Sequence, residues 1–474
     1  MNTDKRSRKI TKICTDVLRQ VSPCEGKREE ILQFATSLME DLSEQLRSSG
    51  IQADVSIQGS IAKDTWLAEE KDLDVFIQLP KDNAEQIFPK VLNVVKSLVG
   101  DKWVEAYAEH PYLEAEIAGV KIDFVPAFKI EKATEATSSV DRTPLHTAYV
   151  KGHLDQQTKD EVRLLKQFTR GVGTYGAEIK VGGLSGYLCE LLILHYGTFL
   201  KTLQGITSWK LGEFIDIEQL YGGCIDEAKL LFNAPLMVVD PVDKNRNVAA
   251  IISKDRLGDV MLAAELFLKN PAIAFFFPAE TVQLPPEALD RRLSMLEYDL
   301  VFVLFKVEEV VPDILWGQLL KTANSLKQLL FRNDFQVFRD AIWSDESELI
   351  VLVFGLEART IAPLRRHRGP PADSREVISF IEKYRNDATV IGPWVEEGRW
   401  MVGIRRHYIE AVSLLQESLK RGNRIGVASG LVDSVKDAEV IVNNEILDFY
   451  SSNEDFAKFL TDFLRGRSKW MEFE

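Results

Sequence analysis

Two aspartates placed two residues apart in an apolar segment constrain this chain more than any other feature of its sequence. In residues 71–77, Asp72 and Asp74 alternate with apolar side chains. Alternate residues of a β-strand point to the same face, so both carboxylates are expected on one face and the apolar residues on the core-facing side. Two like charges this close cost free energy unless a cation lies between them. The segment therefore predicts a strand that presents a divalent-metal site.

A Gly-Ser pair shortly before this strand predicts a phosphate-binding turn. Gly59 and Ser60 open a short predicted helix, and Lys63 adds a positive charge one helical turn later. Glycine lets the backbone approach a ligand closely, and the amides at a helix start can receive phosphate oxygens. The alternative is that the Gly-Ser pair is an ordinary loop and that Asp-x-Asp is a turn or a solvated strand edge.

A third aspartate favours the metal site over that alternative. Asp123 lies between Ile122 and Phe124 in a second alternating segment, which stops at Pro126. A neighbouring strand that brings Asp123 to the same face would complete a cradle of three carboxylates for two Mg²⁺ ions. Two such ions suit in-line displacement at phosphorus, since one activates the attacking hydroxyl and the other holds the triphosphate leaving group.

A Gly-Ser pair, a spacer, Asp-x-Asp and a later strand aspartate resemble the signature of the DNA polymerase β-type nucleotidyltransferase superfamily. Longer strings resemble the archaeal, class I CCA-adding enzymes more specifically. These strings are Gly59–Leu67, His110–Leu113, Asp141–His146, Tyr175–Glu178, Gly186–Glu190, Val239–Val248 and, in the second half, Arg368–Pro371. The resemblance implies a tRNA nucleotidyltransferase that builds the 3′-terminal CCA of tRNA from CTP and ATP without a nucleic-acid template.

The resemblance also implies which residues bind the nucleotide. Lys166 and Tyr175 match positions that hold the triphosphate, and Thr143 and His146 match a segment that contacts the nucleotide. Where this chain has Lys63 the family usually has arginine, which alone can make a bidentate contact. From residue type alone, Lys166 reads as an exposed lysine and Tyr175 as a core tyrosine. Since the metal site needs no further general base, we expect binding from His146 and not proton transfer.

Arg246 is the residue expected to read the base. It lies in a stretch that begins at Pro241 and is expected to be irregular, together with Asp243 and Asn247. The resemblance implies that Arg246 and the growing RNA end together choose C or A. The alternative is a loop salt bridge between Asp243 and Arg246. His195, which follows an apolar helical run, is expected to be a core histidine.

Length and periodicity predict three parts. At 474 residues with 45% hydrophobic content, the chain is long enough for about three domains with real cores. We expect an α+β protein: a nucleotidyltransferase-fold head with a mixed β-sheet and helices in residues 1–150, and a helical, nucleotide-binding neck in 151–275. Residues 276–474 are expected to form a small α+β, tRNA-binding body with a tail, because residues 300–353 alternate as β-α-β-β.

The charge balance bears on the partners. A net charge of −14 lacks the basic footprint usual for nucleic-acid binding. Basic residues do cluster in the second half, and Arg365, Arg366 and Arg368 are expected to hold the RNA, the alternative being ordinary solvated faces. The sequence has no apolar run of membrane-spanning length and no signal core at residue 1, so we expect a cytoplasmic protein without a membrane partner. For the oligomeric state, the expectation that stays open is a homodimer.

Three rival functions remain open from sequence. A poly(A) or oligoadenylate polymerase shares the metal site, and a nucleotide cyclase of the same superfamily can share it too. The rival without catalysis is an RNA-binding protein with a decayed active site. The retention of Asp72, Asp74 and Asp123 argues against decay.

Overall fold

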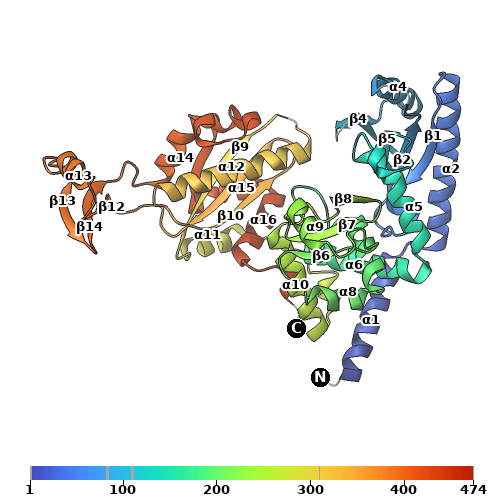
Figure 1. Cartoon of the computed structure of the whole chain (residues 1–474), viewed down its shortest axis with the longest axis horizontal. Coiled ribbons are helices and arrows are strands. Elements are labelled where there is room, and N and C mark those ends of the chain that lie inside the picture. The colour runs from blue at the N-terminus through green and yellow to red at the C-terminus, as the bar shows by residue number, and fades with distance from the viewer. Residues whose placement is uncertain (1–2, 82–84, 108–110, 309, 473–474) are drawn as a thin grey trace. The chain divides into compact units, whose positions relative to one another are not determined.

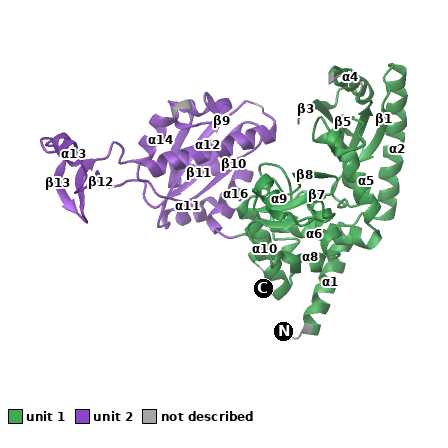
Figure 2. Cartoon of the chain, viewed as in Figure 1, with its two compact units in different colours: residues 1–280, 468–474 green, residues 281–467 purple. Residues whose placement is uncertain are grey.

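The computed structural model describes residues 3–81, 85–107, 111–308 and 310–472, which form two compact units (Figures 1 and 2). The first unit comprises Met1–Glu280 together with Ser468–Glu474, and the second comprises Thr281–Arg467. The chain therefore leaves the first unit, forms the second and returns to the first. The finer division into head, neck, body and tail stays a prediction, and His110 lies outside the described residues.

The first sheet carries the three aspartates. Its strand order is β1-β2-β5-β4-β3, and β2 and β5 are parallel neighbours. As expected from the alternation, Leu73, Val75 and Ile77 of β2 share one core with Ile122 and Phe124 of β5. The strands are β1 Asp54–Gln58, β2 Asp72–Leu79, β3 Trp103–Tyr107, β4 Pro111–Ile117 and β5 Val120–Phe128.

Helices cover this sheet and connect it to the rest of the first unit. Residues 3–21 and 25–48 form two helices, and the apolar sides of α2 and α4 contribute to the core behind β2 and β5. The short helix α3 begins directly at the end of β1, which places the Gly-Ser turn beside β2. The helices are α1 Thr3–Val21, α2 Glu25–Ser48, α3 Gly59–Lys63, α4 Phe88–Val99 and α5 Thr143–His153 (Figure 1).

The remainder of the first unit is a helical layer with a small sheet. Its core centres on Phe168, Phe199, Phe267, Phe275 and Phe276. Helix α6 starts at a capping box formed by Asp155 and Thr158 and ends at Gly173 in the left-handed conformation. The elements are α6 Gln156–Val172, α7 Gly186–Tyr196, α8 Phe199–Ile206, β6 Glu213–Ile215, α9 Ile225–Phe232, β7 Leu236–Asp240, β8 Asp243–Asn247 and α10 Lys254–Lys269.

Two expectations about this region are wrong. The stretch after Pro241 is a hairpin of β7 and β8, because the Asn247 side chain accepts from Val238 N at 2.8 Å and donates to Leu236 O at 3.0 Å. His195 is exposed, because α7 is buried on all sides only as far as Ile193 and leaves the core in its last turn.

The second unit contains two further sheets. The expected β-α-β-β order is confirmed by β9, α12, β10 and β11, whose sheet has the order β10-β11-β9-β15. A separate sheet of order β12-β14-β13 carries α13 (Figure 2). The elements are α11 Pro286–Ser294, β9 Asp299–Lys306, α12 Pro312–Arg332, β10 Val337–Ser344, β11 Leu349–Leu356, β12 Leu364–Pro371, α13 Val377–Tyr384, β13 Ile391–Glu396, β14 Arg399–Arg405, α14 Ala411–Leu419, β15 Glu439–Val442, α15 Leu447–Ser452 and α16 Glu454–Arg465.

Among the described residues, no helix combines the length and the apolar character that crossing a bilayer requires.

Candidate active site

The three aspartates lie on two neighbouring parallel strands, and two of them are paired directly. Asp74 of β2 lies directly opposite Asp123 of β5, and Asp72 lies opposite Lys121. Asp72 is exposed, whereas Asp74 and Asp123 are partly buried. Lys121, which no sequence motif singles out, forms an ion pair through its ammonium group with Glu114 on the adjoining strand at 3.1 Å.

Burial and mutual repulsion act on the two inner carboxylates. Burial raises the pKa of Asp74 to about 6, with Asp72 adding to the rise and Lys63 and Lys121 opposing it. Burial likewise raises the pKa of Asp123 to about 7, where Lys121 opposes the rise and Asp74 adds to it. Both carboxylates therefore lie in surroundings that do not fully compensate their negative charge.

The donor set fits a divalent cation. Oδ1 of Asp123 is buried and has no hydrogen-bond partner among the described residues. Carboxylate oxygens are the ligands that hard divalent cations prefer. The described part of the chain holds no ready-made group of three metal-binding side chains, so the aspartates form an incomplete shell that further oxygen ligands would have to complete.

The predicted phosphate turn lies against this carboxylate pair. Gly59 directly follows β1 with a φ of +67°, in the left-handed region that favours glycine. Its backbone packs so closely on the Asp74 side chain that no Cβ would fit between them. Ser60 follows in the first turn of α3, so the Gly-Ser pair and the aspartates are brought together as the sequence predicts.

Lys63 and Lys166 share one buried network. Lys63 Nζ lies 2.6 Å from Oε2 of Glu190 on α7, and Thr65 Oγ1 donates to Oε1 of the same carboxylate at 2.5 Å. Lys166 Nζ donates to Thr65 O at 3.0 Å. The reading of Lys166 as an exposed lysine is therefore wrong, and burial lowers the pKa of its ammonium group. The sequence did not point to Glu190 as a site residue, although it ends a family-like string.

Tyr175 and Lys166 converge on the start of α7. A Cβ added at Gly186 would lie 3.2 Å from the Tyr175 hydroxyl and 3.3 Å from Lys166 Nζ. Ser185 caps this helix by accepting from Leu188 N. The two residues predicted to hold the triphosphate are thus placed at one helix N-terminus, which favours negative charge.

Asp240 gathers the residues expected around the base. Its Oδ2 atom lies 2.8 Å from His146 Nε2 and 2.8 Å from Arg246 Nη1. Its Oδ1 atom accepts from the Tyr187 hydroxyl at 3.1 Å. Arg246 is therefore paired, but the suggested pairing with Asp243 is wrong, because Asp243 pairs with Arg142 at 2.9 Å.

Tyr187 connects the two groups of predicted residues. Its ring stacks on His146 with a centroid distance of 4.4 Å, and Lys63 Nζ lies 5.7 Å from the centroid of the same ring. Beside this contact, Thr143 opens α5 directly after Arg142. The residues predicted to hold the triphosphate and those predicted to contact the nucleoside are thus linked by side-chain contacts within the first unit.

A cavity adjoins the Arg246 side of this site. It encloses about 760 Å³ and is lined in part by Arg142, Ser185, Asn245 and Arg246. This volume falls within the range of about 300–1,000 Å³ that is usual for small-molecule sites. The cavity can therefore take a nucleotide base and its sugar.

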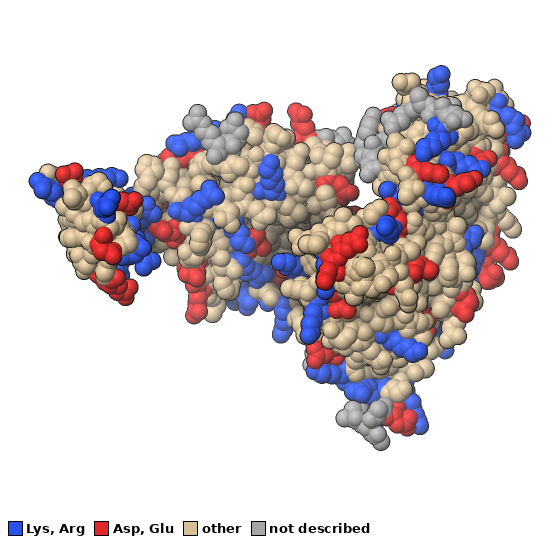
Figure 3. Space-filling view, viewed as in Figure 1, with Lys and Arg blue, Asp and Glu red and all other residues tan. Residues whose placement is uncertain are grey.

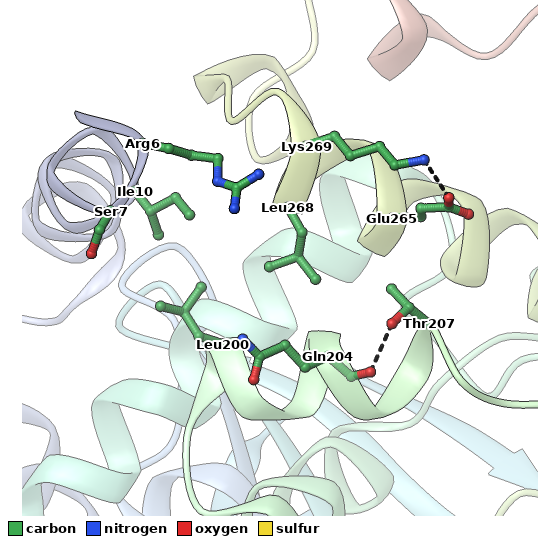
Figure 4. A pocket seen from close by; sticks show the side chains of 9 residues that line it. All are labelled: Arg6, Ser7, Ile10, Leu200, Gln204, Thr207, Glu265, Leu268 and Lys269. Carbon is green, nitrogen blue, oxygen red and sulfur yellow. Dashed lines mark hydrogen bonds and ion pairs between the residues drawn. The ribbon is translucent and has the colours of Figure 1, made fainter. Parts of the chain in front are cut away.

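A second hollow of the first unit is built differently. It encloses about 590 Å³ between α1, α8 and α10, and Arg6 and Leu268 point toward it (Figure 4). Three of its polar side chains are paired locally, because Lys269 pairs with Glu265 and Thr207 donates to the Gln204 carbonyl. Its lining contains none of the residues predicted to bind nucleotide or metal, so it is separate from the candidate active site.

The three arginines expected to hold RNA lie on β12 in the second unit. Arg365, Arg366 and Arg368 are all exposed. Alternation along the strand places Arg366 and Arg368 on one face and Arg365 on the other. Arg366 pairs with Glu396, and Arg365 lies 3.6 Å from Asp334. The β12–β14 module shows acidic as well as basic side chains, so no uniform basic face is present in that view (Figure 3).

Three family models match successive parts of the chain. A nucleotidyltransferase domain matches residues 39–146, which include the three aspartates. The second domain of tRNA nucleotidyltransferase matches residues 160–277, and the C-terminal domain of CCA-adding enzyme matches residues 298–442. The chain is therefore an enzyme of the nucleotidyltransferase class, and this class implies the use of a divalent metal ion.

Curated relatives narrow the class to one family. A CCA-adding enzyme of Methanosarcina acetivorans is 34% identical over 438 residues, covering 90% of this chain and 93% of the relative. One of Methanosarcina barkeri is 36% identical over 410 residues, with coverages of 85% and 88%. One of Pyrobaculum islandicum is 33% identical over 418 residues, with coverages of 87% and 94%. The chain belongs to the family of archaeal CCA-adding enzymes. CCA addition is the activity of that family, and the matches do not favour the polymerase, cyclase or non-enzymatic alternatives.

Proposed function

We propose that this enzyme adds C, C and A to the 3′ end of tRNA from CTP and ATP without a nucleic-acid template and releases pyrophosphate. The observation that carries the proposal is the continuity of the site. The paired Asp74 and Asp123 adjoin the Gly59 turn, and Lys63, Tyr187 and His146 lead from there to the cavity at Arg246.

Asp72, Asp74 and Asp123 are the proposed metal-binding and catalytic residues. Asp72 and Asp74 would hold two Mg²⁺ ions, and Asp123 would hold one of them. When bound, two such metal ions lower the pKa of the attacking 3′-hydroxyl and stabilise the charge on the leaving pyrophosphate. The partnerless Oδ1 of Asp123 supports this assignment, because a buried carboxylate oxygen without a donor among the described residues is an available cation ligand.

The triphosphate is proposed to lie between the α3 turn and the start of α7. Gly59 allows close backbone approach, and Ser60 offers an amide and a hydroxyl. Lys63 Nζ donates to the buried Glu190 carboxylate and Lys166 Nζ lies beside it on Thr65 O, and these two amino groups are the proposed donors to the polyphosphate. Tyr175 adds a hydroxyl donor beside Lys166.

Thr143, His146 and Arg246 are proposed to bind the nucleoside end. Cytosine and adenine both present an amino donor beside a ring-nitrogen acceptor, whereas uracil and guanine present a carbonyl in place of the amine. Arg246 is a donor only, so it can address the ring nitrogen but not the amine. The amine is then left for an RNA phosphate or a backbone carbonyl to accept.

The remaining parts of the proposal concern partners and location. Exposed Arg365, Arg366 and Arg368 are proposed to contact the tRNA backbone. A homodimer is the proposed assembly, which light scattering of the purified protein tests. A cytoplasmic location is proposed because tRNA and nucleoside triphosphates are found there.

One experiment separates this function from its rivals. The protein is incubated with tRNA lacking CCA, Mg²⁺ and each labelled nucleotide, and the RNA 3′ end is then sequenced. Addition of C, C and A with no further extension supports the proposal. A long A tail indicates a poly(A) polymerase, a cyclic nucleotide without RNA extension indicates a cyclase, and no product with intact tRNA binding indicates a binding protein.

A further inference from the structure

We infer that Asp240 is a positioning residue for nucleotide choice, because one buried carboxylate holds both His146 and Arg246 at the edge of the nucleotide cavity. The inference rests on the proposed base-reading role of Arg246. Asp240 lies at the end of β7 and is completely buried, so it acts on the substrate only through the side chains that it holds.

The carboxylate is held at both oxygens. Oδ1 accepts from the Val242 amide and from the Tyr187 hydroxyl, each at 3.1 Å. This leaves Oδ2 aimed in a fixed direction, where His146 Nε2 and Arg246 Nη1 share it at 2.8 Å each. Four partners match the about four lone-pair sites of a carboxylate. A change at Asp240 therefore reaches His146 and Arg246 at the same time.

The elements around this carboxylate are held in place by further hydrogen bonds and a ring contact. The β7–β8 hairpin that carries Asp240 and Arg246 is fastened by the Asn247 side chain, which bonds the backbone of Leu236, Val238 and Ala249. Tyr187 both donates to Asp240 and stacks on His146 with an interplanar angle of 28°. Supporting hydrogen bonds and packing of this kind restrict the side chain that reads the base to a narrow range of positions.

The partners of Asp240 favour the ionised form of its carboxylate. Burial raises the pKa of Asp240, but His146 and Arg246 lower it by more, so that the net pKa lies below its ordinary value. Arg246 remains 37% exposed at its side chain and lines the cavity. Its guanidinium therefore bridges a buried anion and the open pocket, and its orientation there depends on Asp240.

Removing the Asp240 carboxylate has different effects on the enzyme depending on whether it only stabilises the hairpin or also positions Arg246. If Asp240 only fastens the hairpin, its removal lowers stability and slows incorporation of all four nucleotides equally. If it aims Arg246, its removal selectively weakens the distinction between CTP or ATP and UTP or GTP. The two roles are thus separated by a ratio of rates, which does not depend on the fraction of folded enzyme.

Asp240→Asn is the primary variant, since it keeps the shape and removes the charge. Values of kcat/KM are measured for all four nucleotides on a tRNA lacking CCA and on one ending in CC. We expect discrimination against UTP and GTP to fall by about 10- to 100-fold, the range for losing a hydrogen bond to a charged group. Glu161→Gln is the matched control. It neutralises a half-buried carboxylate that accepts from Phe199 N, and it should leave discrimination unchanged.

A double-mutant cycle with Arg246→Ala identifies the path of the effect. If Asp240 acts through Arg246, Asp240→Asn should have little further effect on discrimination in the Arg246→Ala background. Full independence of the two effects would overturn the inference. If Arg246→Ala itself keeps wild-type discrimination, the proposed reading role of Arg246 is wrong. If Arg246→Ala loses discrimination and Asp240→Asn keeps it, that role stands and the positioning inference fails.

Tyr187→Phe keeps the test decisive if Asp240→Asn does not fold. This variant removes one donor to Oδ1 and preserves the ring that stacks on His146. We expect a smaller loss of discrimination in the same direction, and unchanged discrimination would count against the inference.

Discussion

The backbone of Gly59 packs so closely on the Asp74 carboxylate that a Cβ atom at position 59 would overlap Oδ2 of Asp74. The contact joins the phosphate turn to the carboxylate pair, and it forms because β1 and β2 run antiparallel with Gln58 opposite Asp74. Any side chain at position 59 must therefore displace the Asp74 carboxylate. A change in the backbone of the Gly59 turn therefore also changes the position of a proposed metal ligand.

Gly59→Ala should abolish nucleotidyl transfer while leaving tRNA binding in place. Gly50→Ala is the matched control, because Gly50 has a φ of +73° but no atom within 4 Å of its Cβ position. Both variants carry the strain of a left-handed alanine, about 1–2 kcal/mol, and only the first displaces Asp74. Equal activity in the two purified variants would show that the close approach at Gly59 is dispensable.

Asp123→Asn should lower transfer by orders of magnitude and yet stabilise the metal-free protein at pH 8. Because folding raises the pKa of Asp123 to about 7, its ionised form destabilises the fold. This cost is absent below the ordinary pKa of 3.8 and grows as the pH rises to the folded value of about 7, above which it stays constant at about 4 kcal/mol. Thermal unfolding in a chelator measures the gain. Adding Mg²⁺ should stabilise the wild type more than the variant, and the opposite order would contradict the metal assignment.

Glu190→Gln should raise the KM for all four nucleotides without changing the choice among them. It leaves Lys63 and Lys166 without their shared buried anion, and breaking a buried pair costs about 3–5 kcal/mol. Lys129→Ala is the control, because Lys129 and Asp54 also lie 2.6 Å apart but are 62% and 61% exposed. An ion pair this exposed to solvent contributes little to stability. Chemical denaturation and steady-state kinetics test both variants, and a Glu190 variant with wild-type KM would remove the network from the triphosphate site.

Replacing Arg365, Arg366 and Arg368 together with alanine should weaken tRNA binding and flatten its salt dependence. Each phosphate contact contributes to the slope of affinity against salt concentration, so three lost contacts reduce that slope. The control replaces exposed Lys5, Lys9 and Lys12 of α1, which removes the same charge elsewhere. Filter binding across a salt series compares them. Identical slopes in the two triple variants would place the RNA on other residues.

The sequence alone predicts that Asp74 and Asp123 share one face of the sheet, because the pattern that identifies each strand lies in neighbouring residues. Period-two alternation identifies β2 and β5, and with them the common face of Asp74 and Asp123. The partners that complete the site are distant along the chain. Lys63 and Glu190 are separated by 127 positions, and His146 and Asp240 by 94. No local pattern reports such pairs, so Glu190 and Asp240 were visible only as members of family-like strings.

Two strands escape prediction from sequence for a related reason. The β8 segment, Asp243–Asn247, is polar throughout, and its pairing depends on the Asn247 side chain. Strand β12 carries exposed arginines and ends in two prolines, so its sequence does not resemble a strand. Its pairing with β14 is known only from the structure. Both elements lack the apolar alternation from which a strand is inferred.

The return of the chain to its first unit has a consequence for biosynthesis. Trp470 is buried in the core of that unit, with its ring centroid 5.7 Å from that of Phe275. A ribosome makes the whole of the second unit, residues 281–467, between these two aromatic residues. Until residue 470 has been synthesised, the first unit lacks the side chain that packs on Phe275 in the finished fold. The core of the first unit can therefore be completed only after the whole second unit has been synthesised. A chain released before residue 470 lacks the tryptophan that fills this part of the core.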